Sequence, residues 1–127
     1  MPVPLGGFMK KTLKNAKEIA KYLLSTETPR YTPDTEWNTK CYLHDWEETF
    51  KGCKATLKTV NVSELRYGLL IMNLDQESVD KYKLLSVKTI PPLVVRGNKV
   101  IEGNHRLRVL KLSKTKTVRV YVVEELT

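Results

Sequence analysis

The sequence predicts an α+β domain in residues 58–127, preceded by an N-terminal helix. Apolar residues recur at helical spacing in some segments and alternate, as they do in strands, in others. A Gly-Asn turn also joins two short apolar runs in the manner of a hairpin. After residue 57 the order is strand, helix, hairpin, helix and strand, which is typical of a small α+β domain.

Composition limits the class of protein. The chain has 127 residues, 41% apolar and 28% charged, as in one soluble globular domain. No apolar run approaches the roughly 20 residues that span a bilayer, and the first residues lack the pattern of a signal peptide. The two cysteines form no disulfide framework. We therefore expect a cytoplasmic protein with reduced thiols and no membrane partner.

Residues 1–57 are predicted to form an N-terminal helical and loop extension of unknown role. A helix is expected from Lys10 to Leu24, because the following apolar residues share one stripe: Leu13, Ala16, Ala20, Leu23 and Leu24. The prolines in residues 25–38 indicate a loop, and residues 45–50 a short helix. Four aromatic residues are expected to pin this part onto the rest of the domain: Trp37, Tyr42, Trp46 and Phe50.

Three side chains in this extension are of types that bind zinc. They are Cys41, His44 and Cys53. Their spacing is loose and no fourth ligand is evident in the sequence. Buried thiols and a surface histidine are therefore the simpler interpretation.

The second half opens with a strand and a helix. Residues 59–62 alternate between polar and apolar types, which predicts a strand. Asp75 is a suitable N-cap for a helix in which Val79, Tyr82 and Leu85 recur at helical spacing. Pro91 and Pro92 end that helix and begin an extended run.

A hairpin, a helix and a last strand complete the predicted domain. Residues 93–95 and 100–101 are its two arms, joined through Gly97 and Asn98. The next helix runs from Asn104 to about Leu112, and residues 113–117 are polar turn material. Alternating valines from Val118 to Val123 predict the closing strand.

The charge is concentrated in the same half. The chain carries a net charge of +8, and residues 58–127 hold thirteen Lys/Arg against seven Asp/Glu. Residues 1–57 hold nine against seven. A basic C-terminal half favours a polyanionic partner, DNA, RNA or a nucleotide, while a solvated basic surface is the plain alternative.

The junction of the hairpin with the last helix is the strongest candidate for an anion site. Glu102 ends a strand, Gly103 permits a tight turn, and Asn104 can cap the helix. Unpaired backbone N–H groups and the helix dipole favour negative charge at such a helix start. Arg106, in the first turn, adds a forked cationic donor.

Residues 60–123 resemble the ParB/sulfiredoxin fold, also described as a ParB-like nuclease domain. The resemblance is carried by a strand that ends at residues 64–66, a helix at 77–82, a strand at 92–95, a Gly-x-x-Arg turn at 103–106 and a closing strand at 118–123. It implies a mixed sheet with flanking helices.

In that family the Gly-x-x-Arg turn binds nucleotide phosphates. The resemblance thus implies binding of ATP, ADP or CTP with Mg²⁺ by Gly103, Asn104, His105 and Arg106. Glu102 ends the strand beside this turn, where its carboxylate can hold Mg²⁺ or accept a proton, and His105 is the second catalytic candidate. Simpler interpretations pair Glu102 with Arg106 or Arg108, treat His105 as a satisfied half-buried side chain and leave Gly103 as a turn residue.

Departures from the family pattern narrow the functions that are expected of this chain. Asn104 stands where sulfiredoxins carry their nucleophilic cysteine, so thiol chemistry is not expected. Few residues follow Arg106 in this sequence, so the DNA-reading domain of partition proteins is not expected. The His-Arg form resembles the family's small-molecule kinases, in which a Glu near the first strand is the base. Glu64 is the nearest candidate here, with Arg66 and Arg108 as accessory residues.

Two hypotheses follow. One is a nucleotide-dependent phosphotransferase or nucleotide hydrolase that acts at the junction. The other is a non-catalytic or nuclease-like protein of a phage or plasmid, which binds nucleic acid or a host protein through the basic half. A nuclease normally needs a carboxylate cluster for its metal ions, and Glu102 alone gives little support for one.

Overall fold

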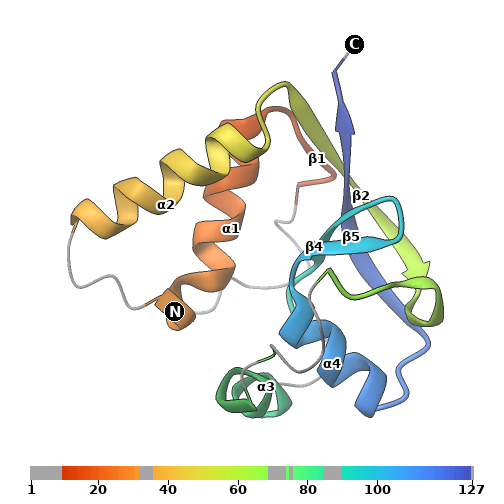
Figure 1. The fold of residues 1–127 in the computed structure, drawn as a ribbon. Helices are drawn as coiled ribbons and strands as arrows, with labels where there is room; N and C mark the ends of the chain where they lie inside the picture. The colour runs from red at the N-terminus through yellow and green to blue at the C-terminus, as the bar shows by residue number, and fades with distance from the viewer. Residues whose placement is uncertain (1–9, 32–35, 69–73, 75, 85–89, 127) are drawn as a thin grey trace.

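A computed structural model describes residues 10–31, 36–68, 74, 76–84 and 90–126, of which residues 27–31, 36–42, 78 and 81 are described by their backbone alone. The elements of this part are β1 (Thr12–Leu13), α1 (Ala16–Tyr31), α2 (Glu36–Thr49), β2 (Cys53–Asn61), a 3-10 turn η1 (Val62–Glu64), α3 (Gln76–Lys83), β3 (Leu93–Arg96), β4 (Lys99–Glu102), α4 (Asn104–Leu112) and β5 (Thr117–Glu125) (Figure 1). No helix in the described ranges is long and apolar enough to cross a membrane.

The strands form one mixed, open sheet in the order β1-β2-β5-β3-β4. The long strands β2 and β5 pair antiparallel along nine residues, from Cys53 with Glu125 to Asn61 with Thr117. β3 runs parallel to β5, and β4 returns antiparallel to β3 as a hairpin. The α+β class and the mixed sheet are therefore confirmed.

Helices cover both faces of this sheet. Side chains alternate between faces along a strand, and neighbours in β3 and β5 belong to different hydrophobic clusters. Val94 and Tyr121 pack with α1 and with Phe50, which follows α2. Leu93 and Val120 pack in a second cluster with α3 and α4. Figure 1 shows α1 and α2 away from α3 and α4, with the sheet beside both pairs.

The elements predicted for the second half are present. α4 has the predicted bounds, and the hairpin turns at Gly97, whose φ is 60°. α3 begins at Gln76 with Val79 buried, while the predicted N-cap Asp75 lies outside the described residues. The strand predicted at residues 59–62 begins earlier, at Cys53, and ends at Asn61. The family resemblance has it end at residues 64–66, which is wrong because residues 62–64 form η1.

The first predicted helix begins six residues later than expected. Leu13 belongs to β1, and α1 starts at Ala16 because Asn15 caps it: the Asn15 Oδ1 accepts the Glu18 N–H at 3.0 Å. Asn15 and Glu18 thus have the spacing of a capping box. The predicted loop at residues 25–38 is also largely wrong, since α1 continues to Tyr31 and α2 begins at Glu36.

The boundary predicted between residues 57 and 58 falls inside β2. Strand β1 and helix α1 share their hydrophobic cluster with Val94 of β3 and Tyr121 of β5, so the N-terminal elements complete the sheet. Trp46 and Phe50 are buried in this cluster, as expected of the aromatic residues. The side chains of Trp37 and Tyr42 lie outside the described residues.

Candidate functional site

The Gly-x-x-Arg turn connects β4 to α4 at the place that the sequence predicts. Gly103 is the N-cap of α4 and has φ 107°, a left-handed conformation that disfavours other residues. A Cβ at this position would lie 2.9 Å from Leu93 Cγ and 3.1 Å from Arg106 Nη2. Gly103 is therefore required both by its backbone angle and by its close neighbours.

Arg106 lies in the interior of the protein. Its side chain is 0% exposed, and its Nη1 donates to the carbonyl oxygens of Pro91 and Pro92, each at 3.1 Å. Its guanidinium carbon lies 5.9 Å from the centre of the Tyr82 ring. In this arrangement Arg106 holds α4 onto the segment before β3 and offers no surface to a phosphate group.

The other residues of the turn are also buried. Asn104 and His105 are 5% and 3% exposed. The Asn104 Oδ1 accepts the Gly68 N–H at 2.8 Å, and its Nδ2 donates to the Val100 carbonyl at 3.4 Å. Asn104 thereby ties the chain after β2 to α4. These contacts give a structural role to the residues that, according to the family resemblance, bind phosphate.

Among the described residues, the predicted metal ligands do not gather into a site. Glu102, the proposed Mg²⁺ ligand, is half-buried at the end of β4. Cys53 is buried, His44 is exposed, and the side chain of Cys41 is outside the described residues. In the described part of the chain no group of three or more His, Cys, Asp or Glu side chains is placed to hold a metal ion.

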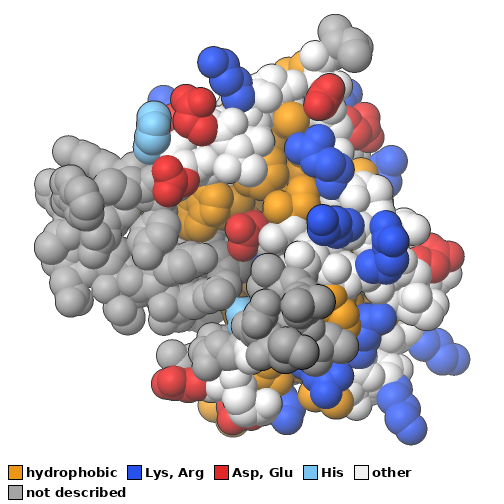
Figure 2. Space-filling model, in the orientation of Figure 1, with side chains coloured by type: hydrophobic (Ala, Val, Ile, Leu, Met, Phe, Trp, Pro, Cys, Tyr) orange, Lys and Arg blue, Asp and Glu red, His pale blue; other side chains and the backbone are white. Residues whose placement is uncertain are grey.

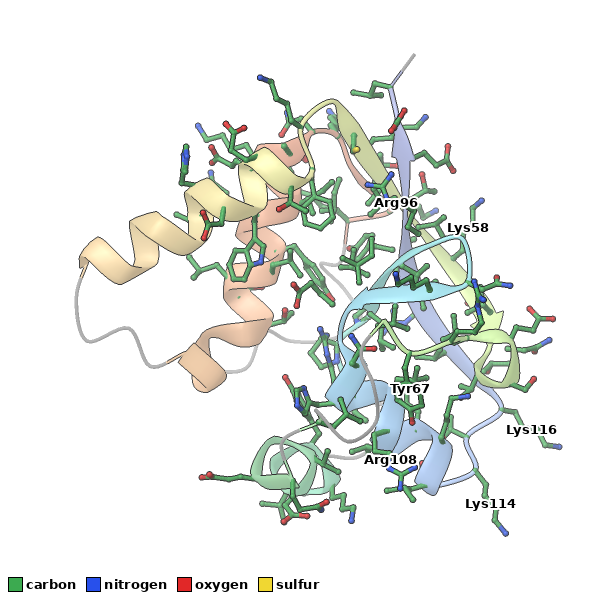
Figure 3. The ribbon with its side chains drawn as sticks, viewed as in Figure 1. Lys58, Tyr67, Arg96, Arg108, Lys114 and Lys116 are labelled. Carbon is green, nitrogen blue, oxygen red and sulfur yellow. The ribbon has the colours of Figure 1, made fainter. Side chains whose placement is uncertain are left out.

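The three accessory candidates lie on different elements. Glu64 is exposed in η1, where its carboxylate accepts the Asn61 amide at 3.5 Å, so its contact is with the end of β2. Arg66 is exposed and runs beside β4, its N–H donating to the Asn98 carbonyl at 2.8 Å. Arg108 is half-buried on α4 (Figure 3).

A second candidate site lies where α4 leads into β5. An open hollow of about 430 Å³, here called the lysine hollow, is lined by Asn61, Val62, Ser63, Lys111, Lys114, Thr115 and Lys116. The Val62 N–H donates to the Lys116 carbonyl at 2.9 Å, which joins the two walls of the hollow. The sequence gives no single motif for it, since its residues come from two segments about fifty residues apart.

Lys114 has an unusual backbone conformation in this hollow. α4 ends in a Schellman motif: the Thr115 N–H donates to the Leu110 carbonyl at 3.0 Å and the Lys114 N–H to the Lys111 carbonyl at 3.2 Å. Its left-handed position is usually a glycine, but here it is Lys114 with φ 55°. Among the described residues Lys114 is the only non-glycine residue with positive φ. A strained residue that carries a charge is a reason to look for function there.

The lysines of the hollow keep their charge available. None of the three forms a salt bridge with any described residue. The Lys111 Nζ lies 5.7 Å from the centre of the Tyr67 ring, which orients it without neutralising it. Figure 3 shows Lys114 and Lys116 at the lower right of the molecule, and Figure 2 shows blue side chains gathered along that side.

Comparison with protein-family models, with curated proteins and with solved structures gives no match to this chain.

Proposed function

We propose that this protein binds nucleic acid through its basic surface, with the lysine hollow as the site that receives backbone phosphates. The observation that carries the proposal is that Lys111, Lys114 and Lys116 all line one open hollow, without a salt bridge in the described part of the chain. Ser63 and Thr115 add hydroxyl donors of the kind that bind phosphate oxygens.

The overall charge supports this assignment. A net charge of +8, with the excess in residues 58–127, raises the local concentration of polyanions around the protein. In Figure 2 most of the basic side chains lie on the right of the view, whereas acidic side chains are scattered over it. A face on which basic side chains gather is the electrostatic feature expected of a nucleic-acid-binding surface.

The burial of the Gly103–Arg106 turn supports the choice of site. A phosphate at the turn would need donors that face solvent, and in this structure Arg106 is 0% exposed. Lys114 and Lys116 of the hollow are exposed, whereas Arg106 of the turn is buried. For this reason we place the phosphate contacts at the hollow and treat nucleotide chemistry at the turn as the competing hypothesis.

The test is the salt dependence of binding to a fluorescein-labelled DNA duplex, measured by fluorescence anisotropy between about 50 and 200 mM NaCl. A triple variant removes the cations of the hollow: Lys111→Ala, Lys114→Ala and Lys116→Ala. If all three lysines contact phosphates, the slope of log affinity against log salt becomes shallower by up to about 2.7. The affinity of this variant for the duplex is also expected to fall.

A matched variant removes three other exposed lysines, at and beside α1: Lys14→Ala, Lys17→Ala and Lys21→Ala. It has the same net charge as the hollow variant and is expected to keep most of the wild-type slope. Equal losses in the two variants would show that net charge, not the hollow, drives binding. Binding and turnover of ATP, ADP or CTP with Mg²⁺, with no affinity for nucleic acid, would overturn the proposal in favour of an enzyme.

A further inference from the structure

The strands β2 and β5 extend past their neighbours at one end. β1 pairs only with Ala55 and Thr56 of β2, and β3 reaches only to Val120 of β5. The last three β2–β5 pairs therefore stand as a two-stranded antiparallel ribbon within the described part of the sheet. We call them the ribbon tip: Thr59 with Arg119, Val60 with Val118, and Asn61 with Thr117.

The two faces of the ribbon tip differ in character. Val60 and Val118 point to the face that packs against the cluster of α3 and α4. The alternation of a strand then places the other four side chains together on the opposite face. They are Thr59, Asn61, Thr117 and Arg119; the first three are exposed and Arg119 is partly exposed. This face carries only hydrogen-bonding side chains.

These side-chain types match the edges of DNA bases. Arginine bonds to the O6 and N7 of guanine through two parallel hydrogen bonds, asparagine bonds to the N6 and N7 of adenine in the same way, and threonine contacts several bases. The Asn61 amide donates to Glu64 at 3.5 Å, a long contact that a base can replace. The major groove of B-form DNA is wide enough for a two-stranded ribbon.

The ribbon tip is continuous with the lysine hollow. Asn61 belongs to both, and Lys116 of the hollow directly precedes Thr117. Cations beside a face of hydrogen-bonding side chains are the arrangement that holds phosphates while bases are read.

We propose that the ribbon tip enters the major groove of double-stranded DNA and reads base edges through Arg119 and Asn61, while the lysine hollow holds the adjacent phosphates. This inference rests on the proposed function and adds to it a form of nucleic acid and a mode of recognition. B-form DNA is favoured over RNA because the major groove of an A-form RNA helix is too deep and narrow for side chains to read.

The experiment begins with selection of bound sequences from a library of DNA duplexes that contain a randomised centre. Wild-type protein is expected to enrich a motif. Arg119→Lys keeps the charge but loses the forked donor, and Asn61→Ala removes the amide. Each is expected to lower the ratio of affinities for the selected and a scrambled duplex by roughly 5- to 150-fold, with the salt slope of binding unchanged.

Matched controls outside the tip are Arg96→Lys and Asn98→Ala, both at exposed positions of the β3–β4 hairpin. These two variants are expected to keep the wild-type ratio of affinities for the selected and the scrambled duplex. A selected duplex made with 7-deazapurines, which lack the N7 acceptor of the major groove, is expected to bind the wild type as weakly as the scrambled duplex does. Unchanged thermal unfolding of each variant shows that the fold is intact.

The two proposals fail in different ways. If wild-type protein binds duplexes, single strands and RNA equally and enriches no motif, the ribbon tip does not read bases, although the proposed function stands. A motif that is unaffected by Arg119→Lys, by Asn61→Ala and by 7-deazapurines also overturns the inference. If the wild type binds no nucleic acid at all, the proposed function itself is wrong.

Discussion

Tyr22 and Arg106 donate hydrogen bonds to the same atom, the carbonyl oxygen of Pro92. The Tyr22 hydroxyl lies 2.6 Å from it and the Arg106 Nη1 3.1 Å. Tyr22 comes from α1 and Arg106 from α4, whose residues pack in different hydrophobic clusters. The carbonyl that precedes β3 therefore connects the two helical layers of the protein.

We expect this connection to contribute strongly to stability. Arg106→Ala removes two hydrogen bonds from a charged donor and leaves a cavity, so the free energy of unfolding should fall by at least about 3 kcal/mol. Tyr22→Phe should cost about 0.5–1.5 kcal/mol. Urea denaturation measures both. Arg108→Ala, in the same helix but half-buried, serves as the control, with a loss below about 0.5 kcal/mol. If Arg106→Ala is as mild as Arg108→Ala, the guanidinium has no structural role.

Gly103 is expected to resist substitution more than another glycine with positive φ. Gly103→Ala places a Cβ 2.9 Å from Leu93 Cγ, whereas a Cβ at Gly52 meets nothing within 4 Å. Both positions have positive φ, so an alanine at either one is expected to lower the free energy of unfolding by about 1–2 kcal/mol. Gly103→Ala should cost about 1–3 kcal/mol more than Gly52→Ala in urea denaturation. Equal losses would mean that the backbone angle alone requires glycine at position 103.

We expect Lys114 to lower the stability of the fold and to strengthen nucleic-acid binding. Lys114→Gly relieves the left-handed conformation, and we expect it to stabilise the fold by about 0.5–1 kcal/mol while it weakens nucleic-acid binding. Lys116→Gly, whose position lacks a positive φ, should weaken binding and also destabilise the fold. Thermal unfolding and anisotropy measure the two effects. A Lys114→Gly variant that binds as wild type would remove Lys114 from the phosphate contacts.

Tyr121 should make the protein sensitive to alkaline pH. Burial raises the pKa of its phenol above the ordinary value of 10.0, although the nearby charge of Arg119 opposes this. The folded state thus favours the neutral phenol. This contribution to the stability of the fold is fully present below about pH 10 and is lost as the pH rises through the raised pKa. Above about pH 10 the free energy of unfolding should fall less steeply for Tyr121→Phe than for wild type. Identical pH profiles would contradict this assignment.

The second half of the fold was predictable because its signals are local. Gly97 and Asn98 mark the hairpin, and Gly103 with Asn104 marks the start of α4, each within a few residues of the element it defines. The N-terminal half was harder. Leu13 fits a helical stripe by spacing, but its pairing with Ala55 in β1 depends on a contact far along the chain.

The candidate sites show the same division. The sequence located the Gly103–Arg106 turn, but the burial of Arg106 depends on Pro91, Pro92 and Tyr82, which only the fold brings beside it. The lysine hollow was not foreseen as a site, because Asn61 and Lys116 meet only when β2 pairs with β5.

The pairing order of the sheet also affects how the protein is made. β5 lies between β2 and β3, yet it is the last described strand along the chain. During synthesis about sixty further residues must therefore be added after β2 before its partner β5 is made. Until then the apolar side chains of the neighbouring helices are uncovered. A nascent chain that stops before Thr117 contains all the helices of the described residues but cannot complete the five-stranded sheet. The ribosome thus completes the centre of this fold only with its final described strand.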